Sequence, residues 1–192
     1  MTVWQGLCAA EVLPFENPAR KKTQVGKKKK NQQVIWLGNV FIYFLEAGAL
    51  LAFKKVLGKE PFFVIYGDNY TKFDLLDLKL YNQEMNADVS ILYHWRSNIT
   101  NSGISLFDED SRVKKFIEKP KEIDNKNDWV NAGIYYFSNN HIINEIEKYD
   151  DFGKDLFPKL LGLGYNIFGL KKSVELIAVD TPELLKNNLA NQ

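Results

Sequence analysis

An acidic side chain follows an apolar segment in the stretch FFVIYGDNYTKFDL, residues 62–75. Residues 62–66 have the composition of a fully buried strand, and Gly67 and Asp68 come directly after them. In an open α/β sheet, ligands bind beyond the carboxyl ends of the strands, where a glycine allows a tight bend. Asp68 could therefore cap a helix, bind a hard divalent cation or act as a general base. From this short stretch alone, a turn or capping residue is the simplest interpretation.

A second group of polar residues lies further along the chain. Glu118 and Lys119 end the segment VKKFIEKP, and Asn131 begins NAGIYYF. A carboxylate can accept hydrogen bonds from two sugar hydroxyls, and a lysine supplies a point charge for a phosphate. Gly103 and Gly133 on flanking strands would let a sugar ring approach the backbone. Together the segments predict a sugar-phosphate site, although singly EKPK is better explained as a solvated strand end and NAG as a bulge.

The pattern of apolar residues predicts alternating helices and strands. Residues 46–58 have helical spacing, and Thr71 and Asp74 stand at capping-box spacing before a second helix that ends near residue 86. A polar turn joins two strands in a predicted hairpin. Strands are expected at 62–66, 87–95, 102–107, 112–120, 129–137, 165–170 and 174–179, with helical spacing at 140–149 and a helix starting at Thr181. This alternation favours a mixed α/β sandwich built on a largely parallel sheet.

Length and charge indicate one globular domain preceded by a basic segment. The chain has 192 residues, of which 45% are hydrophobic and 26% charged. Residues 1–33 carry seven Lys or Arg against two Glu, so we expect a flexible segment there and an α/β domain over 34–192. The single cysteine, Cys8, excludes an internal disulfide and suits the cytoplasm. The longest apolar stretch has twelve residues, whereas a membrane-spanning helix needs about 20.

The order of the segments resembles a known family. It is similar to the sugar-phosphate nucleotidyltransferases, such as mannose-1-phosphate guanylyltransferases and glucose-1-phosphate thymidylyltransferases, over residues 46–188. The resemblance rests on six segments in the same order: AGALLAFKKVLGKEPFFVIYGDNYTKFDL, ADVSILYHW, SGISLFDEDSRVKKFIEKP, NAGIYYF, DFGKDLFPKLL and VDTPELLKN. It implies a Rossmann-like nucleotidyltransferase fold. It also implies an Mg²⁺-dependent attack of a sugar 1-phosphate on the α-phosphorus of a nucleoside triphosphate, releasing pyrophosphate.

The resemblance also implies roles for individual residues. Asp68 matches the carboxylate that holds Mg²⁺, and Asp180 is the candidate for a second metal ligand, because Ala178 stands where relatives commonly have Asp. Glu118 matches the residue that binds sugar hydroxyls, and Lys119 the one that meets the sugar's phosphate. The expected catalytic residues are thus Asp68 and Lys119, the metal ligands Asp68 and Asp180, and the substrate-binding residues Gly67, Gly103, Glu118, Asn131 and Gly133.

One part of the family pattern is missing. In relatives the first strand is followed by a Gly-rich loop with an Arg and then a Pro-Lys pair, whereas residues 1–33 have no run of glycines and the first Pro-Lys is at 120–121. We therefore expect an N-terminally truncated or rearranged member that rejoins the family near Glu46. The alternative is a non-catalytic sugar-phosphate-binding or regulatory module.

A third interpretation assigns the function to the basic segment, through binding of nucleic acid or an anionic membrane. No nucleic-acid motif supports it, so neither partner is expected. His94 and His141 have no metal-ligand spacing with Cys8. The sequence leaves the base, the sugar and assembly into a homo-oligomer open.

Overall fold

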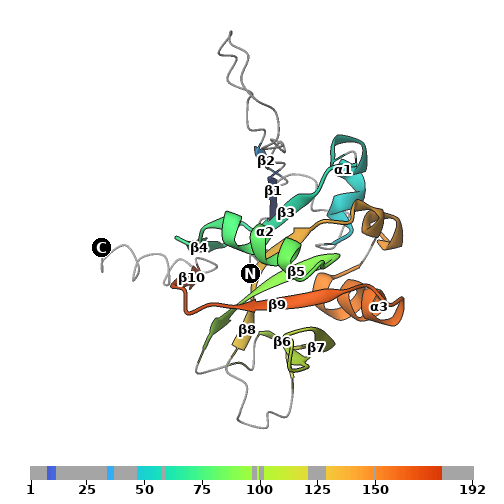
Figure 1. Ribbon diagram of the computed structural model, residues 1–192. Helices are drawn as coiled ribbons and strands as arrows, with labels where there is room; N and C mark the ends of the chain where they lie inside the picture. Colours follow the sequence, from blue (N-terminus) through green and yellow to red (C-terminus); the bar gives the residue numbers. More distant parts are fainter. Residues whose placement is uncertain are drawn as a thin grey trace, which may run out of the picture.

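The computed structural model describes residues 8–11, 34–36, 47–57, 59–96, 99, 102–120, 129–148 and 150–178 (Figure 1). Its strands are β1 (Cys8–Glu11), β2 (Val34–Trp36), β3 (Phe62–Tyr66), β4 (Asn69–Thr71), β5 (Val89–Trp95), β6 (Gly103–Phe107), β7 (Val113–Glu118), β8 (Trp129–Phe137), β9 (Ile167–Lys171) and β10 (Leu176–Ala178). Its helical elements are α1 (Ala49–Leu57), α2 (Leu75–Glu84), the 3₁₀ turn η1 (Asn140–Glu145), the π turn η2 (Phe152–Leu156) and α3 (Phe157–Gly162). Within these ranges no helix is long and apolar enough to cross a membrane.

The main sheet has the order β2-β1-β3-β8-β5-β9, with β6 paired to β8 and β7 paired to β6. β8 runs antiparallel to both of its neighbours β3 and β5, and β9 runs parallel to β5. The strands β3, β5 and β9 therefore point the same way, with β8 inserted between the first two. The predicted mixed α/β fold is confirmed. Of the largely parallel pairing that we expected, the described strands form one parallel pair, β5 with β9, because β8 enters antiparallel between β3 and β5. We predicted that a flexible segment ends and the domain begins at residue 33. The strand β1 lies before this boundary and β2 directly after it.

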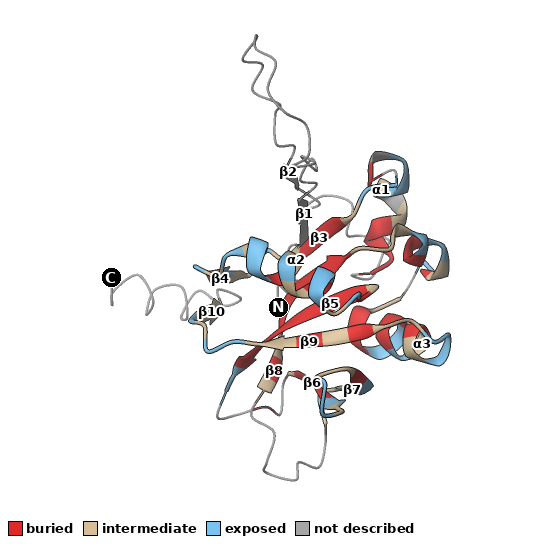
Figure 2. Ribbon diagram, viewed as in Figure 1, coloured by how far each residue is buried: buried red, intermediate tan, exposed pale blue. Residues whose placement is uncertain are grey.

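Alternate residues of the central strands bury opposite faces of the sheet, as the period of two in a strand requires. Phe62 and Val64 of β3 pack in the cluster that includes α1 and α3, whereas Phe63 packs with Leu78 of α2. The central strands are consequently buried between helical elements on both faces (Figure 2). The predicted strands around residues 62–66, 87–95, 102–107, 112–120 and 129–137 appear as β3, β5, β6, β7 and β8.

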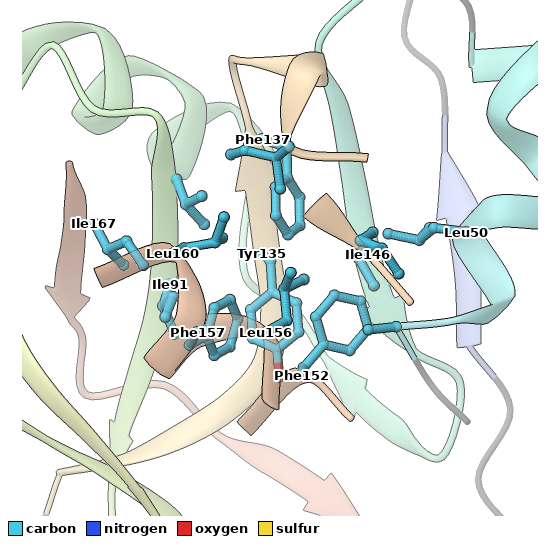
Figure 3. Packing of buried hydrophobic residues seen from close by; sticks show 14 of the residues in the cluster. Leu50, Ile91, Tyr135, Phe137, Ile146, Phe152, Leu156, Phe157, Leu160 and Ile167 are labelled. Carbon is cyan, nitrogen blue, oxygen red and sulfur yellow. The ribbon is translucent and has the colours of Figure 1, made fainter. Parts of the chain in front are cut away.

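An aromatic cluster joins β8 to the segment that contains η2 and α3. Tyr135 lies 5.1 Å, between ring centroids, from both Phe152 and Phe157, and all three side chains are fully buried (Figure 3). Tyr66, at the end of β3, packs edge-on against Tyr135 at 5.7 Å. Because aromatic rings bury large apolar areas, this cluster fixes η2 against the end of β3.

The start of α2 differs from the prediction. The helix begins at Leu75, and the N–H of Leu76 donates to Oδ1 of Asp74 at 2.9 Å, so Asp74 is the N-cap. Thr71 lies in β4, opposite Leu176 of β10, and its hydroxyl accepts a hydrogen bond from the N–H of Phe73. The predicted capping box is therefore wrong, because strand pairing holds Thr71 in extended backbone. The helical spacing at 140–149 gives only the 3₁₀ turn η1.

Replacement of Asp74 by Ala should lower the free energy of unfolding by about 0.5–2 kcal/mol, because the amide that it caps loses its acceptor. Urea denaturation of the variant beside Thr71→Ala measures the difference. A larger loss for Thr71→Ala than for Asp74→Ala would contradict the capping assignment.

Candidate functional site

The predicted carboxylate lies in a turn between two strands. Gly67 and Asp68 connect β3 to β4, directly beyond the carboxyl end of β3. Gly67 is exposed, whereas Asp68 is half-buried and its Oδ1 atom is shielded from solvent. Because α2 is capped by Asp74, Asp68 does not serve as its N-cap. Asp68 is thus a turn residue, as the simplest interpretation held, and the metal-ligand and general-base interpretations remain for its carboxylate.

A bulge in β8 faces this turn. The pairing of β5 with β8 passes from Ile91–Tyr135 to Tyr93–Asn131, so β8 has two more residues than β5 over this interval. Gly133, within the bulge, has φ +66°, a backbone conformation that favours glycine. A Cβ at this position would lie 2.8 Å from Cγ of Tyr66. The segment NAG is thus a bulge, as the simpler interpretation held, and it packs against the end of β3.

Hydrogen bonds link the bulge to the turn. Nδ2 of Asn69, the residue after Asp68, donates to the carbonyl of Ala132 at 3.1 Å. Asn131 accepts from the N–H of Gly133 at 3.0 Å and donates through Nδ2 to the hydroxyl of Tyr135 at 2.8 Å. Both ends of the Asn131 amide are therefore held, and the bulge and the turn form one unit.

The second predicted group gathers around Glu118. Gly103 of β6 is paired with Glu118 of β7, and a Cβ on Gly103 would lie 2.7 Å from Oε2 of that carboxylate. A Cβ on Gly153 of η2 would lie 2.5 Å from the same oxygen. The space that we assigned to a sugar ring at Gly103 thus receives the Glu118 carboxylate. The aromatic contacts of Phe152, next to Gly153, join this group to Tyr66 at the turn.

Known proteins resemble this chain in sequence and in fold. A family model described as Nucleotidyl transferase matches residues 45–173. The chain belongs to the nucleotidyl transferase family. Over 118 residues it is 35% identical to the mannose-1-phosphate guanylyltransferase catalytic subunit beta of Drosophila pseudoobscura pseudoobscura, covering 59% of this chain and 31% of that protein. It is 30% identical over 118 residues to the glucose-1-phosphate adenylyltransferase of Clostridium novyi (strain NT), covering 57% and 30% respectively. The nucleotidyl transferase chain therefore spans about a third of the length of these curated relatives.

Solved structures show the same fold. HddC from Yersinia pseudotuberculosis, complexed with GMP-PN, superposes with a TM-score of 0.62 at 21% identity, covering 79% of this chain and 64% of that one. The nucleoside-diphosphate-sugar pyrophosphorylase of Vibrio cholerae RC9 gives a TM-score of 0.58 at 16% identity, with 75% and 64% covered. The Rossmann-like nucleotidyltransferase fold and the sugar-phosphate nucleotidyltransferase resemblance are confirmed.

The two other predicted site residues are Asp180 and Lys119. Asp180 lies outside the described residues, and Lys119 is exposed at the end of β7. Among the residues that the structure describes, no three His, Cys, Asp or Glu side chains form a group that could hold a metal ion. Sequence reasoning missed Asn69, Tyr135 and Gly153. Gly153 stands in the segment DFGKDLFPKLL, but its place in the site is evident only from its contact with Glu118, 35 positions away.

Lys119 has an unusual backbone conformation. Its φ is +46°, in the left-handed region that is unfavourable for residues with a Cβ, and it precedes Pro120, which further restricts it. The N–H of Lys119 donates to the carbonyl of Ser102 at 3.3 Å, which helps hold this conformation. Strained residues of this kind cluster at functional sites, and here the strain falls on a predicted catalytic residue.

Replacement of Lys119 by Gly should raise the free energy of unfolding by about 0.5–1 kcal/mol, because glycine adopts a positive φ without strain. Lys119→Ala is the matched control, since it also removes the cation but retains the Cβ. Chemical denaturation compares them. If the alanine variant gains as much stability as the glycine variant, backbone strain is not the cause.

His94 lies one residue beyond Tyr93, the β5 partner of Asn131, and is only 5% exposed. Burial lowers the pKa of His94 below its ordinary value, and the positive charge of Arg96 lowers it further. The folded protein therefore favours the neutral imidazole.

Because the pKa of His94 is lower in the folded state, the unfolded chain takes up the proton first as the pH falls. The contribution of His94 to the free energy of unfolding is therefore fully present above about pH 6.5, and it is lost as the pH falls through the lower pKa of the folded state. Urea denaturation between pH 8 and 5 should show a decrease in stability that is smaller in His94→Gln. A His94→Gln variant whose stability falls as steeply with pH as that of the wild type would contradict this assignment.

Proposed function

We propose that this domain transfers a nucleoside monophosphate from a nucleoside triphosphate to a sugar 1-phosphate. The products are a nucleotide sugar and pyrophosphate. The observation that carries the proposal is the contact between the Gly67–Asp68 turn and the Asn131–Gly133 bulge, made by the hydrogen bond from Asn69 to Ala132. Asp68, which could hold a metal ion for the phosphates, and Asn131, whose amide could meet sugar hydroxyls, are each next in sequence to a residue of this hydrogen bond.

The sugar side of the reaction is assigned to β7 and β8. The Glu118 carboxylate accepts hydrogen bonds from sugar hydroxyls, and Asn131 presents an amide that Tyr135 and Gly133 hold in place. Lys119 supplies the positive charge for the sugar's phosphate. Gly103 leaves room for the Glu118 carboxylate, and Gly133 lets the bulge pack against Tyr66.

The phosphate side is assigned to Asp68. Magnesium prefers oxygen ligands and is commonly held by one or two carboxylates together with substrate phosphates, so a single carboxylate at the end of β3 fits such a site. The pairing of β10 with β4 sets Ala178 opposite Asn69, next to Asp68. Asp180 follows two residues later in the sequence, and we propose it as the second ligand. When bound, the metal would offset negative charge on the triphosphate.

In the proposed step, an oxygen of the sugar's phosphate forms a bond to the α-phosphorus. The bond from that phosphorus to the oxygen bridging the α- and β-phosphates breaks, and its electron pair leaves with pyrophosphate. No covalent bond to the protein forms. The residues of this chain therefore act by orienting the two phosphates and by stabilising their charge.

The proposed partners are the two small-molecule substrates, without nucleic acid or membrane. A single cysteine supports a cytoplasmic setting. Association into a homo-oligomer is open to measurement by light scattering.

A second candidate is a module that binds sugar phosphate without catalysis. It is favoured by the contrast between the group around Glu118 and the lack of a Gly-rich run in residues 1–33. Isothermal titration separates the two functions. Binding of a nucleoside triphosphate with Mg²⁺ supports the transferase, whereas binding of sugar 1-phosphate alone supports the module.

Replacement of Asp68 by Asn should reduce pyrophosphate release by about 10²–10³-fold, because the variant loses the charge that holds the metal. The assay uses a panel of nucleoside triphosphates and sugar 1-phosphates with Mg²⁺. Asp77→Asn on α2 removes a carboxylate that is 53% exposed, and should leave the rate unchanged. Equal rates in wild type and Asp68→Asn would refute the role of Asp68, and no turnover with any pair would refute the transferase.

A further inference from the structure

The Glu118 carboxylate lies close to two glycines from different parts of the chain. Its Oε2 atom is 2.7 Å from the position that a Cβ would take at Gly103 and 2.5 Å from the corresponding position at Gly153. Distances under 3.0 Å require something to shift, so neither position accepts even a methyl group while the carboxylate stays in place. The backbones of β6 and of η2 therefore both lie close against this carboxylate.

Hydrogen bonds hold the backbone around Gly153 in place. The N–H groups of Gly153 and Lys154 donate to Oδ1 of Asp151 at 2.8 and 2.9 Å, and Oδ2 of Asp155 accepts from the N–H of Asp151 at 2.8 Å. These bonds resemble a reciprocal helix cap and fix the first turn of η2. Phe152, fully buried against Tyr135, anchors the same turn in the core. Single π turns occur often at functional sites.

The backbone conformation does not explain the glycine at 153. Among the described glycines, positive φ angles occur at Gly133 and Gly164, and Gly153 is not one of them. An alanine would fit this backbone, and glycine inside a helix is less favourable than alanine. Space is therefore the property that Gly153 provides. Two side chains use it: the Glu118 carboxylate, which lies nearer, and the Phe116 ring, whose Cε1 atom is 2.9 Å from the position of a Cβ at Gly153.

We propose that Gly153 is a positioning residue that sets where the Glu118 carboxylate lies, together with Gly103. A side chain at 153 displaces Oε2 by about 1 Å, since ordinary contacts begin near 3.4 Å. The consequence for sugar 1-phosphate binding rests on the proposed function, in which Glu118 accepts bonds from sugar hydroxyls. A misplacement of about 1 Å can reduce a rate by about 10²-fold, so we expect a tenfold to hundredfold loss in kcat/KM for sugar 1-phosphate.

The first test is structural and requires no activity. Crystal structures of wild type and Gly153→Ala should show the Glu118 carboxylate displaced from residue 153, with η2 unchanged. Gly103→Ala should displace the same carboxylate from residue 103, and serves if Gly153→Ala does not fold. Gly162→Ala is the matched control, because a Cβ there meets nothing within 4 Å. An unmoved carboxylate in both Gly153→Ala and Gly103→Ala would overturn the proposal.

The second test is functional and uses Glu118→Ala. In the wild-type background, Gly153→Ala should raise KM for sugar 1-phosphate at least tenfold with little change in KM for the triphosphate. In the Glu118→Ala background it should cause no further loss, because the carboxylate through which the substitution acts on the sugar is gone. Equal losses in both backgrounds would overturn the proposal in favour of a purely structural glycine. If wild type neither binds nor turns over sugar 1-phosphate, the proposed function fails, and the crystal structures still decide whether Gly153 positions Glu118.

Discussion

The packing of the buried Tyr135 ring is the interaction on which the site depends. Its ring contacts Tyr66 at the end of β3 and Phe152 at the start of η2, and its hydroxyl accepts the hydrogen bond from Asn131. Tyr135 therefore supports three parts of the site: the strand end that leads to Asp68, the bulge that carries Asn131 and the turn that borders Glu118. Removing that ring would leave a large cavity and loosen all three at once.

Glycine has two distinct uses around this support. Gly133 adopts a positive φ and also lies against Tyr66, so both conformation and space require it. Gly103 and Gly153 have ordinary backbone conformations and provide space alone. Polar groups of the site thus fit against the neighbouring backbone because glycines there carry no side chain. Such close contact with the backbone is compatible with a tightly packed core.

The sequence predicted the central strands and the hairpin well, because alternating and continuous apolar runs report burial directly. It misplaced the start of α2, since Thr71 belongs to a strand whose partner, Leu176, lies far along the chain. The grouping of Gly103 with Glu118 could be expected from the hairpin. The contact of Gly153 with Glu118 could not, because it depends on how η2 packs and leaves no periodic signal. Local patterns reveal elements, whereas contacts between distant segments need the fold.

The central place of β8 has a consequence for how the protein folds. β8 pairs with β3 and β5, and both strands precede it by long stretches of chain, while β9 adds to β5 from still further away. Contacts between distant residues form slowly, because a large loop must close before any of them stabilises the chain. Neither Asp68 nor Asn131 reaches its final surroundings before β8 enters the sheet. The surroundings of Asp68 and of Asn131 are thus completed together, when β8 pairs with β3.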